Sequence, residues 1–187
     1  MNAFSESLGA VTSAFEELQI RYLIGGSLAS SARGVLRATV DVDVLATIQA
    51  VQAEAFATAL GGDWYADPEM IRSCIHAGRA FNVIHRPTGQ KIDIFPASSE
   101  FHRSELERAT PVRLDESEAQ FPVATAEDIL VAKLEWYQAG GGMSERQWSD
   151  VIGVLKANPN LDLVYVRRCA ERLAVGGLLE RAVRQAR

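Results

Sequence analysis

This 187-residue sequence lacks the features that mark several large protein classes. Its two cysteines, Cys74 and Cys169, are far apart and form no Cys-x-x-Cys motif, so we expect a reducing compartment and no disulfide framework. No run approaches the roughly 20 apolar residues of a membrane span. The N-terminal residues have neither the basic start nor the apolar core of a signal peptide. We therefore expect a cytoplasmic protein without a membrane segment.

Signatures of other chemistries are also missing. The three histidines, His76, His85 and His102, show no metal-ligand spacing, and no Gly-x-Ser-x-Gly motif points to a serine hydrolase. Basic residues (19) are fewer than acidic ones (24), which argues against a protein whose whole surface binds nucleic acid. The last 21 residues contain six arginines, so this tail suits either an RNA contact or a solvated helix face.

What remains is the composition of a soluble globular protein, with 48% hydrophobic and 23% charged residues. The pattern predicts an α+β fold, with a small mixed β-sheet and flanking helices over residues 1–120 and a helical region over residues 121–187. Helices are expected at 3–19, 27–33, 49–60, 99–109, 125–138, 144–157, 162–174 and 177–186. Ser27 can cap the second of these, and a capping box from Ser144 to Gln147 starts the helix at 144–157. Strands are expected at 21–26, 39–46, 79–85, 90–95 and 110–114. Residues 63–78 are ambiguous.

Two aspartates stand inside a valine-rich strand pattern, in the stretch TVDVDV. Residues two apart in a strand project to the same face, so Asp41 and Asp43 lie together while Val40, Val42 and Val44 face a core. Two close carboxylates repel, and one of them must take a proton or find a cation. Mg²⁺ meets this need, because it prefers oxygen ligands from one or two carboxylates together with substrate phosphates.

Two further features belong with this pair. Asp93 is another acid within an apolar strand pattern, KIDIF, and would converge with the pair if the two strands are neighbours. The Gly25-Gly26-Ser27 turn lets the backbone approach a phosphate closely, with a serine hydroxyl as a further donor. Taken singly, these could be an ordinary turn, a solvated edge strand and an aspartate paired with Lys91 or Arg37. Their joint occurrence favours a phosphoryl-transfer site.

The combination resembles the signature of the nucleotidyltransferase superfamily, which has the DNA polymerase beta-like fold. That signature is Gly-[Gly]-Ser, then acid-x-acid, then a third acid on a later strand, here Gly26-Ser27, Asp41-x-Asp43 and Asp93. The segment from Arg37 through Thr39 to the acid pair is similar to the Arg-x-Thr-x-Asp-x-Asp form of minimal nucleotidyltransferases and abortive-infection-type toxins.

A later helical segment resembles those proteins more weakly. Lys133, Arg146 and Asp150 stand where a lysine and an Arg-x-x-x-Asp motif recur, but Ser149 replaces the lysine that often precedes the aspartate. This departure leaves the substrate class open, and a structural role for all three residues remains an alternative.

The resemblance implies roles for individual residues. Gly25, Gly26, Ser27, Arg37 and Lys133 would bind the nucleoside triphosphate. The catalytic acids Asp41, Asp43 and Asp93 would also hold Mg²⁺, with Asp93 as the base on the acceptor hydroxyl.

We therefore expect a Mg²⁺-dependent nucleotidyltransferase that moves a nucleoside monophosphate from an NTP to a hydroxyl on a small molecule, protein or RNA. It could act as the toxin of a toxin–antitoxin pair, with an antitoxin as partner. A non-catalytic module that binds a nucleotide or a partner on the same fold is the alternative. The presence of all three acids favours the enzyme.

Overall fold

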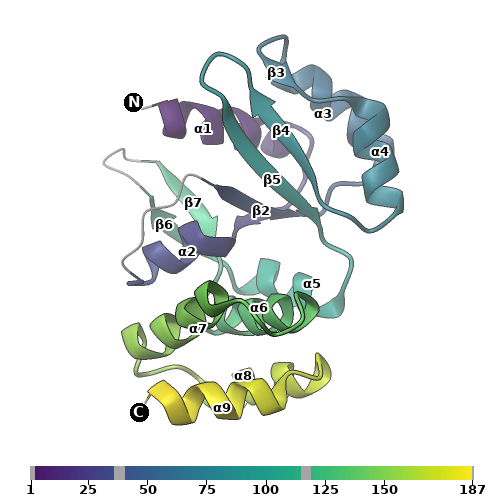
Figure 1. Ribbon diagram of the computed structural model, residues 1–187. Coiled ribbons are helices and arrows are strands. Elements are labelled where there is room, and N and C mark those ends of the chain that lie inside the picture. The colour runs from purple at the N-terminus through teal and green to yellow at the C-terminus, as the bar shows by residue number, and fades with distance from the viewer. Residues whose placement is uncertain (1–2, 36–40, 115–118, 187) are drawn as a thin grey trace.

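The computed structural model describes residues 3–35, 41–114 and 119–186 (Figure 1). Across these residues the strands form one seven-stranded mixed sheet in the order β3-β4-β5-β2-β1-β7-β6. The strands are β1 (Tyr22–Ile24), β2 (Val42–Ala46), β3 (Trp64–Tyr65), β4 (Phe81–His85), β5 (Gln90–Pro96), β6 (Thr110–Arg113) and β7 (Gln120–Val123). The expected α+β class with a mixed sheet is confirmed.

Helices cover the sheet and then continue away from it. They are α1 (Ala3–Glu17), α2 (Gly26–Ala32), α3 (Ala53–Leu60), α4 (Pro68–His76), α5 (Glu100–Arg108), α6 (Ala126–Ala139), α7 (Glu145–Ala157), α8 (Leu163–Arg172) and α9 (Gly176–Ala186), with a 3₁₀ turn η1 (Ala50–Gln52). Figure 1 shows α3 and α4 beside the β3–β4 end of the sheet. In the same view α6 and α7 lie between the sheet and the outermost pair, α8 and α9.

Strand alternation places Asp43 and Asp93 as the sequence predicts, whereas Asp41 comes just before β2 and lies outside the strand expected to hold it. Val42 and Val44 of β2 are buried in the core, whereas Asp43 between them projects from the opposite face. Strand β5 runs parallel to β2, with Asp93 directly opposite Asp43. The buried Ile92 and Ile94 flank Asp93 as the valines flank Asp43, so the two carboxylates stand on the same face of neighbouring strands.

Two elements near the glycine turn and the domain boundary differ from expectation. Helix α2 begins at Gly26 with Gly25 as its N-cap, so Ser27 is inside the helix and does not cap it. The sequence pattern also missed β7, which pairs with β1 in parallel through Ile24 and Val123. The boundary predicted after residue 120 falls within this strand, and the division into two parts stays a prediction.

The C-terminal helices follow their local signals. Ser144 accepts a hydrogen bond from the Gln147 backbone N–H at the start of α7, as predicted for a helix cap. Helix α9 buries Leu179 and Ala182 on one side. Among the described residues, no helix combines the length and the apolar character needed to cross a membrane.

Much of the arginine-rich tail is used within the fold. Arg167 pairs with Glu180 at 2.8 Å, and Arg172 pairs with Glu100 at 3.0 Å. The guanidinium of Arg181 lies 4.4 Å from the ring centroid of Trp148. Structural contacts therefore account for three of the arginines that the sequence left open to an RNA contact.

Candidate functional site

The glycine turn and the first strand acid are in direct contact. The Gly25 backbone N–H donates a 2.8 Å hydrogen bond to the Asp43 carbonyl, which extends the β1–β2 pairing into the turn. Gly26 has a φ of +58°, and a Cβ at this position would collide with the Asp43 carboxylate. The second glycine is therefore required both by its left-handed backbone and by the space that Asp43 occupies.

The Asp43 carboxyl lies in a strained electrostatic environment. Burial raises its pKa, and the charges of Asp93 and Asp41 raise it further. Lys133 and a hydrogen bond from the Ser27 backbone N–H lower it in part. The two acids predicted beside Asp43 thus act on it in the fold, and a further cation would stabilise its charged form.

In this structure a lysine balances the third acid. The Lys91 ammonium contacts the Asp93 carboxylate at 2.6 Å, and this contact together with the charges of Asp41 and Asp43 raises the lysine pKa. Lys91 pairing, which the sequence left open for Asp93, therefore occurs. The Lys91 side chain is 43% exposed, so the ion pair is one that solvent and a competing cation can replace.

The positions of the acidic side chains show whether they could hold the predicted Mg²⁺ ions. As their side chains stand, no group of three acidic, histidine or cysteine residues in the described part of the chain is arranged to hold a metal ion. Asp93 is turned to Lys91 and Asp43 accepts from Ser27. The donor chemistry fits, because carboxylates on adjacent strands offer the oxygen ligands that Mg²⁺ prefers. Metal binding would require Asp93 to exchange Lys91 for the ion.

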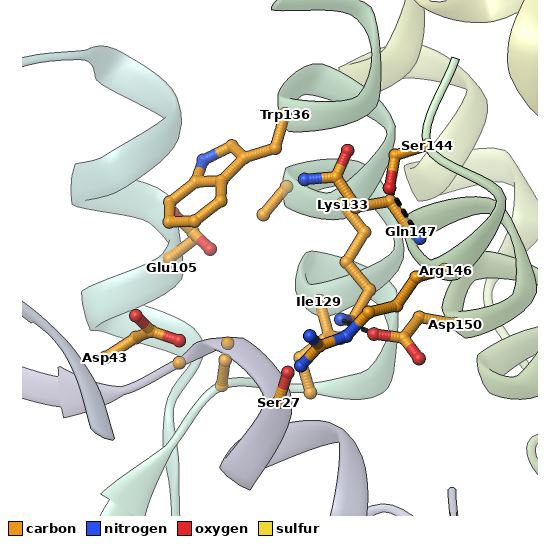
Figure 2. A pocket seen from close by; sticks show the side chains of 14 residues that line it. Ser27, Asp43, Glu105, Ile129, Lys133, Trp136, Ser144, Arg146, Gln147 and Asp150 are labelled. Atoms are coloured by element: carbon orange, nitrogen blue, oxygen red, sulfur yellow. Dashed lines mark hydrogen bonds and ion pairs between the residues drawn. The ribbon is translucent and has the colours of Figure 1, made fainter. Parts of the chain in front are cut away.

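A cavity of about 330 Å³ opens beside the glycine turn. It is lined by Gly25, Gly26, Ser27, Asp43, Glu105, Ala124, Ile129, Ala132, Lys133, Trp136, Ser144, Arg146, Gln147 and Asp150. Figure 2 shows Asp43, Glu105 and Trp136 on one side of it and Lys133, Arg146 and Asp150 on the other. The glycine turn, the strand acid and the helical lysine, which the sequence predicted separately, therefore share one cavity.

The basic side of this cavity comes from α6 and α7. The Lys133 ammonium donates a 2.9 Å hydrogen bond to the Asp150 carboxylate, which holds the lysine at the cavity wall. Arg146, one turn before Asp150 on α7, lines the same wall and is exposed. Asp41 and Asp93 do not line this cavity. Asp93 stands next to Asp43 along the sheet face, and Asp41 comes just before β2. Arg37, predicted to bind the nucleotide, lies outside the described residues.

Sequence reasoning missed Glu105 of α5. This residue is only 6% exposed and lines the cavity, yet the pattern EFHRSELER reads as an ordinary polar surface helix. No hydrogen bond or ion pair to its carboxyl is found among the described residues. Burial raises its pKa well above the usual range, and the nearby Asp128 and Glu135 raise it further. A glutamate at an otherwise apolar-facing position was the only signal in the sequence.

This carboxyl should destabilise the fold at high pH. The folded chain keeps the Glu105 proton at pH values where the unfolded chain has lost it, so stability falls as pH rises from the usual glutamate pKa through the raised one. Glu105→Gln removes this penalty. We expect its melting temperature to exceed that of the wild type by a few degrees at about pH 8, and by less at about pH 5.

The control is Glu107→Gln, an exposed glutamate on the same helix. Its melting temperature should follow that of the wild type in both buffers. A Glu105→Gln gain that is equal at the two pH values would show that the charge of Glu105 is not the cause.

Comparisons with known proteins identify the fold. The solution structure of the antibiotic-resistance factor ANT(2'')-Ia matches with a TM-score of 0.51 and 15% identity over 96% of each chain. The crystal structure of ANT(2'')-Ia in complex with adenylyl-2''-tobramycin matches with a TM-score of 0.50 and 12% identity, over 89% of this chain and 94% of that one. The crystal structure of an antigenic nucleotidyltransferase-like protein from Paracoccidioides brasiliensis matches with a TM-score of 0.49 and 17% identity. This match covers 98% of this chain and 94% of that one. No family model matches the sequence, and no curated protein is similar to it.

The chain therefore has the nucleotidyltransferase fold, in agreement with the resemblance in its motifs. At this level of identity the likeness establishes the fold alone. The argument for function depends on the chain's own residues.

Proposed function

We propose that the protein is a Mg²⁺-dependent nucleotidyltransferase that moves a nucleoside monophosphate from an NTP to a hydroxyl acceptor. The observation that carries the proposal is the row formed by Gly25 just after β1, Asp43 in β2 and Asp93 in β5, next to a cavity with a lysine on its far wall. Such a row combines a close backbone approach with adjacent carboxylates, which is what phosphoryl transfer requires.

The triphosphate would occupy the cavity between the glycine turn and α6. The turn leaves room for phosphate oxygens, and the Ser27 hydroxyl and the Lys133 ammonium face the same space. The Ser27 N–H that now bonds Asp43 would become available to a phosphate once that carboxylate turns toward a cation. Arg146 adds a second positive charge at the outer wall.

The transfer step would use Asp93 as the base. The acceptor hydroxyl oxygen bonds to the α-phosphorus, its proton passes to the Asp93 carboxylate, and the bond from the α-phosphorus to the bridging oxygen breaks to release pyrophosphate. Mg²⁺ held by Asp41, Asp43 and Asp93 would supply charge neutralisation at the attacking and leaving oxygens. Lys91 would have to leave Asp93 before the proton can be accepted there.

A thermal-shift experiment tests the donor site. The wild type is heated with each common nucleoside triphosphate, with and without Mg²⁺. We expect a Mg²⁺-dependent rise in melting temperature for at least one of them, which would name the donor. The absence of any rise with any triphosphate would contradict the proposal.

Lys133 provides a second test of the same site. Lys133→Gln removes the positive charge that faces the glycine turn and leaves Asp150 with less compensation. We expect the dissociation constant of the Mg²⁺-bound triphosphate to rise by about tenfold, the usual effect of losing one charge-assisted contact. Lys156→Gln, at an exposed position on α7, is the matched control and should bind as the wild type does. Equal affinity in the two variants would assign Lys133 a structural role only.

One observation favours a non-catalytic module as the second candidate. Both strand acids already have protein partners, Lys91 for Asp93 and Ser27 for Asp43. A module would bind the nucleotide without Mg²⁺ dependence and release no pyrophosphate. The thermal shift and a pyrophosphate assay together separate the two candidates.

The acceptor and the biological role belong to the same proposal. ANT(2'')-Ia has been crystallised with adenylyl-2''-tobramycin, a nucleotidylated small molecule. A small-molecule acceptor is therefore a reasonable first choice here, beside protein and RNA. A toxin role with an antitoxin partner would use the same chemistry, and growth arrest on expression of the wild type but not of Asp43→Asn would test it.

A further inference from the structure

A second chamber adjoins the nucleotide cavity and has the opposite electrostatic character. It has a volume of about 420 Å³ and shares Gly25, Gly26, Asp43, Glu105 and Trp136 with the first cavity. Its other walls come from the end of β5, the start of α5 and the outer turn of α6. The two spaces therefore meet at Asp43, where the transfer step is proposed to occur.

The ionisable side chains that line the second chamber are acidic, and a cation that enters the chamber would favour their charged forms. Asp43, Glu105 and Glu135 line it, and no lysine or arginine among the described residues does so. His102 also lines it, but its Nδ1 accepts a hydrogen bond from the Ser98 N–H and burial lowers its pKa, so the ring stays neutral near pH 7. The chamber is thus acidic, whereas Lys133 and Arg146 stand only in the first cavity.

Glu105 is a buried acid of this chamber whose carboxyl has no partner among the described residues. Its side chain is more than nine-tenths buried and reaches the cavities, and none of the described residues donates to its carboxyl. Arg108, one turn along α5, is held by Asp128 at 3.2 Å and is not available to Glu105. A carboxyl enclosed by the fold without a protein partner costs stability, and a hydrogen-bond donor or cation that enters the chamber would satisfy it.

An aromatic wall completes the chamber. The Trp136 indole is 43% exposed although it lies beside a largely apolar space, and its ring centroid is 4.9 Å from that of Phe95. An exposed tryptophan next to carboxylates suits a ligand that has both a positive charge and an apolar or ring-shaped face. The chamber volume lies within the range of roughly 300–1,000 Å³ typical of small-molecule sites.

We propose that this second chamber binds the acceptor, and that the acceptor is a small organic cation bearing the hydroxyl to be modified, held by Glu105 and Glu135 against Trp136. This inference rests on the proposed transfer function for the role of the bound molecule. A nucleic-acid acceptor fits less well, because its phosphates would meet three acidic side chains and, within the described part of the chain, no lysine or arginine. The arginines Arg167 and Arg172 on α8 are already paired with Glu180 and Glu100.

Two sugar dimers of one shape test the charge requirement. The β-linked glucosamine dimer carries two amines, and its doubly N-acetylated form has the same ring frame without the charges. Isothermal titration of the full chain should show that the amine form binds at least about tenfold more tightly. Equal binding of both dimers, failure of the amine dimer to bind, or binding of a short single-stranded RNA that displaces it would overturn the proposal.

Variants separate a ligand contact from a structural effect. Glu105→Gln keeps the size of the side chain and should weaken binding of the amine dimer by about tenfold while leaving the acetylated dimer unchanged. Glu107→Gln, exposed on the same helix, should bind both dimers as the wild type does. Unchanged binding of the amine dimer by Glu105→Gln would remove Glu105 from the site. A loss for both dimers alike would show a merely structural role.

Failure of this inference can be told apart from failure of the proposed function. The thermal shift with triphosphates reports the first cavity, and the dimer titration reports the second. A triphosphate response without charge-selective dimer binding would overturn only the acceptor assignment. Dimer binding without any triphosphate response would leave the chamber as a cation site and contradict the transferase.

Discussion

The Asp43→Asn variant is expected to lose nucleotide transfer by at least about a hundredfold while remaining folded. Asp43 is the acid that touches the glycine turn, stands opposite Asp93 and lines both cavities. Asparagine keeps the shape and still offers an oxygen to the Ser27 N–H, but it removes the charge that a metal ion would need. The Mg²⁺-dependent thermal shift with the donor triphosphate should disappear with the activity.

The same variant should be more stable than the wild type when no metal is present. Burial and the charges of Asp93 and Asp41 raise the Asp43 pKa, so the ionised carboxylate is unfavourable in the fold at neutral pH. A higher melting temperature together with lost nucleotide binding would show that the charge of Asp43 lowers the stability of the fold and is needed for function. Asp63→Asn, at an exposed position before β3, is the control and should change neither property. If Asp43→Asn transfers the nucleotide at the wild-type rate, the assignment of the active site fails.

The Gly26→Ala variant should show the opposite combination, with nucleotide binding and stability both reduced. A φ of +58° is unfavourable for alanine, at about 1–2 kcal/mol. The added Cβ would also collide with the Asp43 carboxylate. Either the Asp43 side chain or the glycine turn must therefore move. We expect a fall in melting temperature of about 4 °C or more for a chain of this length. Titration with the Mg²⁺-bound triphosphate should show binding weakened by at least about tenfold, because the phosphate cradle and the acid move together.

Gly62→Ala is the matched control, since a Cβ there meets nothing within 4 Å and its φ is not positive. This variant should bind the triphosphate normally, and its melting temperature should change little. A Gly26→Ala protein with wild-type stability and affinity would mean that the turn does not form the cradle.

The local features of the site were predictable because they depend on neighbours in the sequence. Strand periodicity puts Asp43 on the face opposite its buried valine neighbours, although Asp41 comes just before the observed strand. A glycine pair after an apolar strand likewise predicts a turn with an unusual backbone. The Ser144 cap was predicted for the same reason, because a helix cap involves residues only three apart. One local prediction was wrong, the cap at Ser27, because Gly25 occupies the N-cap position and Ser27 lies inside the helix.

Contacts between distant segments could not be predicted in this way. The register that places Asp93 opposite Asp43 joins residues 50 positions apart, and the placement of β7 beside β1 joins segments about 100 apart. The sequence offered both Lys91 and Arg37 as partners for Asp93, and the fold shows that Lys91 forms the ion pair.

The sequence by itself determined the chemical groups of this protein: a glycine turn, three acids in or next to apolar strands and a lysine on a later helix. The tertiary structure decided which of them meet, since strand order and helix packing bring distant segments together. It also decided the character of the second chamber. Along the chain only its apolar-facing position marks Glu105, and it is the fold that buries this residue without a partner among the described residues. The function of a buried charge depends on what surrounds it in space, which local sequence does not encode.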